Sequence, residues 1–172
     1  DTLDILKQCG AAALGTIDPD LPPILETGEA IVHGWPRALP PSIIHSDLFP
    51  DNVLMLGDRV TGMIDFYFAC TGSMAYDLAV THAAWCFDGT GARCDRALGR
   101  ALIEGYETLR PLGQDERAAL PLLAEGACLR FIASRAQDWL DTPDDALVHR
   151  KDPMDFVRRL EFYRASGQSA FA

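Results

Sequence analysis

The chain has 172 residues, a length typical of one domain with a sizeable apolar core. Apolar residues make up 48% of it and charged residues 23%, which is the composition of a folded globular protein rather than a disordered chain. The formal net charge of −10 argues against a nucleic-acid or membrane partner, and no apolar run reaches the length of about 18 residues that a membrane span needs.

The start of the chain predicts two helices. Apolar residues recur at helical spacing over residues 2–14 and again over residues 21–34. Gly15 closes the first helix, and Gly34 with Pro36 ends the second, because glycine and proline interrupt helical backbone.

A compact β region follows these helices. Pro40-Pro41 imposes an extended approach to Ile43-Ile44, which predicts a short buried strand. Residues 52–56 and 60–64 are typical of strands, and Gly57-Asp58 between them is a tight turn. The two strands therefore predict a β-hairpin.

The rest of the chain is helical in pattern. Amphipathic helices are predicted over residues 74–87, 97–109 and 115–140, and Pro153 is suited to be the first residue of a last helix that ends near residue 165. The fold class expected is therefore mainly α with one small β-hairpin (α+β).

The cysteines predict neither disulfides nor a zinc site. They are odd in number, scattered and without a C-x-x-C pair: Cys9, Cys70, Cys86, Cys94 and Cys128. With no signal peptide in the sequence, we expect free buried thiols in a reducing cytoplasm.

Polar residues that suit phosphoryl transfer gather around the hairpin. A loop offers the carboxylate of Asp47 and the amide oxygen of Asn52, and the returning strand brings Asp65 back beside Asn52. A carboxylate with an amide oxygen suits Mg²⁺, which takes further ligands from water and phosphate. The other carboxylate can orient an attacking hydroxyl, so the set predicts phosphoryl transfer to an alcohol.

The spacing of these residues resembles a known pattern. His45-Ser46-Asp47 with Asn52, then Ile64-Asp65-Phe66 and Gly72–Ala79, resembles the aminoglycoside-phosphotransferase and choline-kinase superfamily, which reads H-G-D-x-x-x-x-N, I-D-[FW] and G-x-P-x-x-D-L-A. The chain departs from it at Ser46 for Gly and at Met74 for Pro, and both departures spare the chemical groups.

A narrower resemblance is to the homoserine kinase branch of that superfamily. It extends from about Leu39 to the C-terminus, and its motifs lie at residues 47–53, 64–70, 76–79, 85–87 and 129–139. Residues 1–38 match only in helical character. The resemblance implies that residues 1–172 are the helical C-terminal lobe of a protein-kinase-like fold, with the catalytic loop and metal hairpin at residues 43–66.

The resemblance also implies roles for the central residues. Asp47 is expected to accept the proton of the substrate hydroxyl, while Asn52 and Asp65 hold Mg²⁺ on the phosphates of ATP. Leu54 and Ile64 are expected to pack beneath the adenine.

Two residues are expected to support the loop. His45 is expected to brace it rather than to carry a proton. Asp77, at the start of a helix, is expected to accept hydrogen bonds from the loop backbone or to stabilise the helix dipole. Neither residue is expected to be catalytic.

Contacts with the acceptor substrate are expected farther along the chain. Tyr67 either faces a substrate or packs in the core. Arg135 and Asp138 can simply form a helix-surface pair; the alternative is that Arg130 or Arg135 meets a substrate carboxylate and Asp138 an ammonium.

No segment of the sequence supplies the glycine-rich loop or the strand lysine that hold ATP phosphates in such kinases. The nucleotide-binding N-terminal lobe is therefore expected to be absent from these residues. The chain alone is then expected to be inactive, and the apolar face that the lobe would cover favours a homo-oligomer.

The function predicted is ATP- and Mg²⁺-dependent phosphorylation of the hydroxyl of L-homoserine, a step of threonine biosynthesis by resemblance. Two alternatives stay open: a kinase of choline, ethanolamine or an aminoglycoside, and a kinase-like binding module without catalysis.

Overall fold

The computed structural model describes residues 2–143 and 145–172. Its helices are α1 (Thr2–Cys9), α2 (Ala11–Ile17), α3 (Ile24–Gly34), α4 (Met74–Trp85), α5 (Arg96–Leu109), α6 (Gln114–Asp141) and α7 (Met154–Ser166). Its strands are β1 (Pro41–Ile44), β2 (Val53–Leu56), β3 (Arg59–Met63) and β4 (Cys70–Ser73), and its 3₁₀ helices are η1 (Pro50–Asn52), η2 (Phe66–Phe68) and η3 (Gly167–Phe171). The predicted class, mainly α with a small hairpin, is confirmed.

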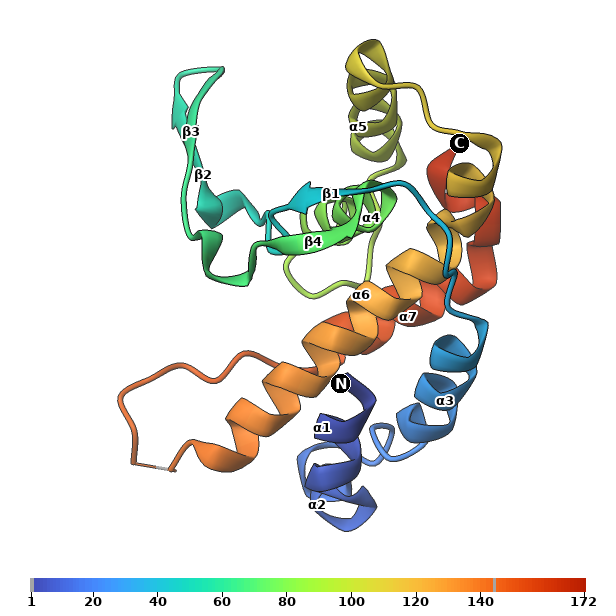
Figure 1. Cartoon of the computed structure of the whole chain (residues 1–172). Helices are drawn as coiled ribbons and strands as arrows, with labels where there is room; N and C mark the ends of the chain where they lie inside the picture. The colour runs from blue at the N-terminus through green and yellow to red at the C-terminus, as the bar shows by residue number, and fades with distance from the viewer. Residues whose placement is uncertain (1, 144) are drawn as a thin grey trace.

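Helix α6 is the centre of the fold. It packs against α1, α3, α4 and α7, and it runs through the middle of the molecule in Figure 1. Small residues let its neighbours approach closely. A Cβ on Gly126 would lie 2.1 Å from the Trp35 ring, so only glycine allows the segment after α3 to pack there. Leu120, Leu123 and Ile132 are fully buried around the same helix.

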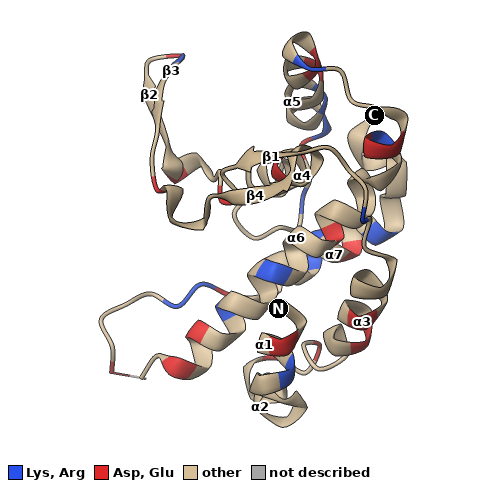
Figure 2. Cartoon of the chain, viewed as in Figure 1, with Lys and Arg blue, Asp and Glu red and all other residues tan. Residues whose placement is uncertain are grey.

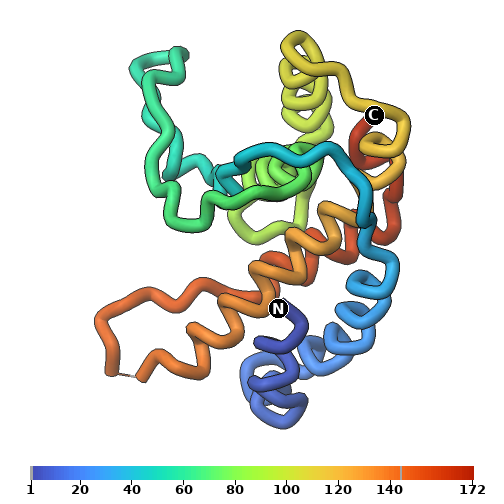
Figure 3. The backbone as a smooth tube through the Cα atoms, viewed as in Figure 1, coloured from blue at the N-terminus to red at the C-terminus, as the bar shows by residue number. Residues whose placement is uncertain are grey.

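The single helix predicted over residues 2–14 is wrong. Gly10 has a φ of 78°, a left-handed conformation that ends α1 at Cys9 and starts α2 at Ala11. The tube in Figure 3 turns back on itself between these two helices. The second predicted helix begins at Ile24 rather than residue 21, and the remaining helices lie within two residues of their predicted bounds.

The predicted hairpin is confirmed, and a second strand pair accompanies it. Strands β2 and β3 pair antiparallel with a bulge between Leu54 and Met55, and Figure 1 shows them extending away from the helices. Strand β1 pairs antiparallel with β4, which the sequence did not predict. The expectation of a buried Ile43-Ile44 strand holds for Ile44, which is 4% exposed, but is wrong for Ile43, which is 83% exposed.

All five cysteines are free, but the expectation that they are buried holds for only two of them. Cys86 and Cys128 are buried, Cys9 and Cys94 are half-buried, and Cys70 is exposed. Among the helices that the structure describes, none is long and apolar enough to cross a membrane.

A buried histidine joins α4 to α7. Nδ1 of His82 lies 2.6 Å from the hydroxyl oxygen of Tyr163, and the imidazole packs against the Phe171 ring at 4.7 Å between centroids. Burial lowers the pKa of His82 from its usual 6.5 to about 4, because a charged imidazole would lose its hydration, and a backbone contact with Ala170 offsets part of this shift.

The depressed pKa of His82 predicts that stability falls with acid. The unfolded chain takes up the proton below about pH 6.5 and the folded chain only near pH 4, so this residue's contribution is lost as the pH falls between the two values. We expect His82 to account for about 3 kcal/mol of the loss in the free energy of unfolding between pH 7 and pH 4, measured by chemical denaturation at the two pH values. The variant His82→Gln should show a shallower pH dependence, and a change at the exposed His33 (His33→Gln) should leave it unaltered. Equal slopes for His82→Gln and the unchanged protein would contradict the prediction.

Candidate active site

A pocket of about 590 Å³ brings most of the predicted site residues together. It lies between the loop before β2, the turn after β3, helix α6 and the segment that leads into α7. Its lining comprises Thr2, Ile5, Asp47, Phe49, Asp51, Asn52, Asp65, Phe68, Arg130, Phe131, Ser134, Arg135, Asp138 and Lys151.

The loop that carries Asp47 is held by α4. The backbone N–H groups of His45 and Ser46 donate to the two carboxylate oxygens of Asp77, at 3.1 and 2.6 Å. The indole N–H of Trp85, at the end of the same helix, donates to the carbonyl of Leu48 at 2.9 Å. One helix therefore anchors the loop on both sides of Asp47.

His45 connects this loop to the hairpin. Its Nε2 lies 2.9 Å from the carbonyl of Ile64, and its Nδ1 accepts the backbone N–H of Asp47 at 3.3 Å. These partners require the imidazole proton on Nε2, where it is committed to a backbone carbonyl. This arrangement fits a brace and gives the ring no nitrogen with which to carry a substrate proton.

Two residues of the site have left-handed backbone. Ser46 has a φ of 66° and Asp65 a φ of 60°. For a residue other than glycine this conformation costs about 1–2 kcal/mol. At Ser46, this conformation explains why the superfamily pattern H-G-D has glycine at the corresponding position. At Asp65, it turns the chain from β3 into η2.

The hairpin places Asp65 beside Asn52. The N–H of Ile64 donates to the Asn52 carbonyl at 3.0 Å, and Val53 pairs with Met63 across the hairpin. The side-chain nitrogen of Asn52 donates to the Asp47 carbonyl at 2.8 Å. Because that nitrogen is used within the loop, the amide oxygen is the atom of Asn52 suited to bind a cation.

The Asp47 carboxylate lies in a half-desolvated position. Burial raises its pKa above the usual value of 3.8, and the charges of Asp65 and Asp51 raise it further. The charge of Arg130 acts in the opposite direction. A carboxylate that is held less acidic than usual is a better proton acceptor for a hydroxyl.

The Arg130 side chain contacts the loop that carries Asp47 rather than solvent. Its guanidinium donates to the Ser46 carbonyl, lies 3.5 Å from an Asp47 carboxylate oxygen, and sits over the rings of Phe68 and Phe131, each 4.7 Å from its Cζ. Stacking of this kind suits the flat arginine head group and not lysine. The predicted contact of Arg130 with a substrate carboxylate stays a prediction, with most of its donors already engaged.

The predicted Arg135–Asp138 surface pair is wrong. Arg135 donates to the Asp155 carboxylate at 3.0 Å and to the Asp152 carbonyl at 2.8 Å, and it stacks on Phe156 at 4.6 Å. It therefore joins α6 to the start of α7. Asp138 lines the pocket without an ion pair among the contacts of the described residues.

Three further predicted residues lie at or beyond the pocket rim. Leu54 and Ile64 are 47% and 43% exposed on the hairpin. Tyr67 is 86% exposed, so it does not pack in the core, and its neighbour Phe68 lines the pocket instead. A substrate contact of Tyr67 stays a prediction.

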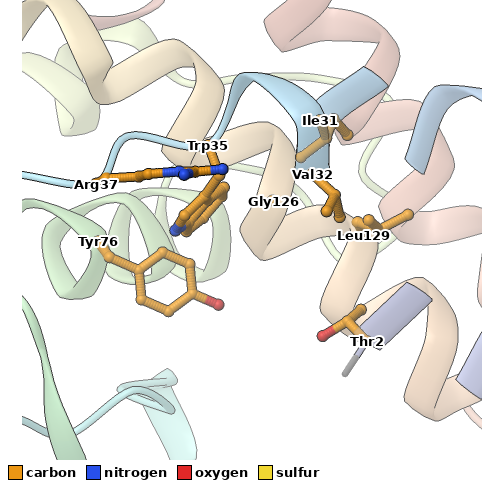
Figure 4. Close-up of a pocket in the computed structure, with 8 residues that line it drawn as sticks. All are labelled: Thr2, Ile31, Val32, Trp35, Arg37, Tyr76, Gly126 and Leu129. Carbon is orange, nitrogen blue, oxygen red and sulfur yellow. The ribbon is translucent and has the colours of Figure 1, made fainter. Parts of the chain in front are cut away.

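A second, smaller pocket of about 380 Å³ is lined mainly by residues of α3, α4 and α6 and by the segment after α3. Figure 4 shows Arg37 beside the Trp35 ring with Tyr76 facing them, and the two rings meet edge to face at 5.7 Å. Burial raises the pKa of the Tyr76 phenol, and the charge and hydrogen bond of Arg130 offset part of the rise. Thr2 lines both pockets, so they adjoin.

The sequence missed several lining residues. Phe49, Phe68 and Phe131 were visible only as apolar positions, and Ser134 had no distinguishing signal. Lys151 also lines the pocket, and it is one of only two lysines in the chain. Its scarcity was the one available signal, and its approach to the pocket depends on how α6 and α7 are joined.

Comparison with known proteins identifies the family. Residues 3–112 match the phosphotransferase enzyme family. The chain belongs to that family. It is 50% identical over 136 residues to a homoserine kinase of Rhizobium etli, an alignment that covers 79% of this chain and 42% of that enzyme. It is 51% identical over 158 residues to a homoserine kinase of Gluconacetobacter diazotrophicus, covering 90% and 49%. The chain thus spans somewhat less than half the length of these relatives.

Charge substitutions around Asp47 should move its pKa in opposite directions. Arg130→Gln removes a neighbouring positive charge and should raise the pKa, whereas Asp51→Asn removes a negative charge and should lower it. An NMR titration of the Asp47 carboxyl carbon measures both shifts. A shift of the same sign in the two variants would show that the carboxyl responds to altered packing and not to these charges.

Proposed function

We propose that the protein containing this chain transfers the γ-phosphoryl group of ATP to the hydroxyl of L-homoserine. The observation that carries the proposal is the gathering of Asp47, Asn52 and Asp65 in one pocket on a loop braced by His45 and Asp77. Phosphoryl transfer demands positioning and charge neutralisation more than covalent chemistry, and this arrangement offers both. The similarity to enzymes named homoserine kinase supports the choice of acceptor.

In the proposed reaction Asp47 receives the substrate hydroxyl proton. Its carboxylate faces the pocket, and its raised pKa reflects partial desolvation and the nearby Asp65 and Asp51 charges. Arg130 keeps the carboxylate in place through the contacts with Ser46 and Asp47. The hydroxyl oxygen then attacks the phosphorus in line with the leaving ADP oxygen.

Mg²⁺ fits this donor set when ATP supplies further ligands. Asn52 and Asp65 would hold the ion, and the crowding of Asp47, Asp51 and Asp65 is the kind of negative charge that a divalent cation offsets. Across the described residues no three or more His, Cys, Asp or Glu side chains group as a metal site. When bound, the ion would neutralise the phosphate charge and orient the γ-phosphoryl group.

We further propose that this chain forms the helical lobe of a kinase-like enzyme and that a nucleotide-binding lobe packs on the β2–β3 hairpin. Support comes from the large apolar side chains that the hairpin exposes, which include Leu54, Leu56, Val60 and Ile64. A compact monomer rarely leaves such a surface uncovered. On this proposal Leu54 and Ile64 contact the adenine.

An acceptor panel tests the proposed function. The full-length protein is incubated with ATP, Mg²⁺ and, separately, L-homoserine, choline, ethanolamine and an aminoglycoside, and ADP release is measured. We expect the highest kcat/KM with L-homoserine. Preference for a cationic alcohol would assign the protein to another branch of its family, and no turnover with any acceptor would support a binding module.

Replacing Asp47 tests the proton acceptor. Asp47→Asn keeps the size of the side chain but removes its basicity, so kcat in the full-length protein should fall by about 10²- to 10⁴-fold with little change in ATP affinity. Asp20→Asn, at an exposed turn between α2 and α3 and outside the pocket, is the control. Turnover of Asp47→Asn within a few-fold of the unchanged protein would remove Asp47 from this role.

Replacing Asp65 tests the metal ligand. Asp65→Asn removes the negative charge and keeps a residue type that tolerates left-handed backbone, so the fold should survive. We expect the strengthening of nucleotide binding by Mg²⁺ to be lost, as followed by calorimetric titration with a non-hydrolysable ATP analogue at several Mg²⁺ concentrations. An unaltered Mg²⁺ dependence would place the ion elsewhere.

A further inference from the structure

The pocket holds three cations, and two of them are already paired within the protein. Arg130 is bound to the Ser46 carbonyl and the Asp47 carboxylate, and Arg135 to Asp155 and the Asp152 carbonyl. Lys151 lines the same pocket, and within residues 2–143 and 145–172 its ammonium forms no ion pair. It is therefore the pocket cation whose charge remains available to a ligand.

The backbone next to Lys151 is fixed. The carbonyl of Asp152 accepts from Arg135 at 2.8 Å, and the Asp152 carboxylate accepts the backbone N–H of Met154 at 2.8 Å at the start of α7. Arg135 and Arg158 balance the charges of Asp152 and Asp155, with Arg158 at 2.9 Å from Asp155 and 3.9 Å from Asp152. The residue after Lys151 is thus anchored to α6, and its acidic neighbours are already compensated.

Asp138 supplies the opposite charge at the same end of the pocket. It lies on the pocket face of α6 with Ser134 and Arg135, close to the helix C-terminus. Figure 2 shows acidic residues on the last turns of α6 and basic residues where the following loop returns toward α7. A separated carboxylate and ammonium at one end of a pocket suit a ligand that carries both charges.

We propose that Lys151 binds the carboxylate and Asp138 the ammonium of the amino-acid acceptor, with its hydroxyl directed to Asp47. The proposal rests on the proposed function and assigns the carboxylate to Lys151 in place of Arg130 or Arg135. It makes the acceptor class an α-amino acid with a short hydroxylated side chain.

The stretch of α6 from Arg130 to Asp138 and an extended acceptor with its hydrogen bonds are similar in length. Arg130, which contacts Asp47, and Asp138 are separated by eight residues of α6, a rise of about 12 Å along the helix. An extended homoserine places about 5 Å between hydroxyl oxygen and amino nitrogen by ordinary bond lengths. With a hydrogen bond of about 3 Å at each end, the ligand spans about 11 Å between the two carboxylates.

Truncated acceptors test each contact separately. In the full-length protein, Lys151→Met should lower kcat/KM for L-homoserine by about 10- to 100-fold and leave 3-amino-1-propanol, which lacks the carboxylate, within a few-fold. Asp138→Asn should lower kcat/KM for L-homoserine and 3-amino-1-propanol but not for 4-hydroxybutyrate, which lacks the ammonium. Lys151→Arg should recover most of the loss, and Lys7→Met, at an exposed lysine paired with Glu29, should change nothing.

The outcomes separate this inference from the proposed function. If the unchanged protein does not phosphorylate L-homoserine, the proposed function fails and this assignment fails with it. If L-homoserine is the preferred acceptor but Lys151→Met leaves its kcat/KM unaltered, or lowers it equally for 3-amino-1-propanol, the assignment alone is overturned.

Discussion

Two adjacent backbone N–H groups, those of His45 and Ser46, point to the single carboxylate of Asp77, and the geometry of the pocket depends on this interaction. Hydrogen bonds to a charged group contribute about 1.5–3 kcal/mol each, which exceeds the cost of about 1–2 kcal/mol for left-handed backbone at Ser46. The strained turn is therefore stable, and it presents Asp47 to the pocket. Removal of the Asp77 charge would leave two donors without a partner and the strain uncompensated.

Arginine side chains form many of the hydrogen bonds and ion pairs between elements that are far apart in the sequence. Arg130 links α6 to the loop of Asp47, and Arg135 links α6 to α7. Both stack on aromatic rings, so each contact combines charge, hydrogen bonding and dispersion. These contacts therefore position the site residues relative to one helix, α6, which is closely packed in the core of the fold. Flat guanidinium groups suit this use because they hold a carboxylate or carbonyl at one edge and a ring on the face.

Local patterns in the sequence were sufficient for the hairpin, for the helices after the first two, and for bringing Asp65 back beside the loop with Asp47 and Asn52. Periodicity reports the apolar face of an element such as α6, and the hairpin needs only its turn and two short strands. Strand β4 was not predicted because its residues, Cys70 to Ser73, show no alternation of apolar and polar side chains. It forms only by pairing with β1, which is far away in the sequence. The sequence also did not predict the helix break at Gly10 or the partners of Arg135. The backbone conformation of a glycine and an ion pair between two helices both depend on tertiary packing.

The ring of His45 lies between the loop and the hairpin with one nitrogen on each side. An imidazole is planar and does not stretch, so it acts as a spacer of constant width between the Asp47 backbone and the carbonyl that precedes Asp65. The separation of the two acidic groups is consequently set by an aromatic ring rather than by flexible side chains. A glutamine or asparagine at position 45 could offer similar polar atoms, but it would replace a rigid spacer with a rotatable one.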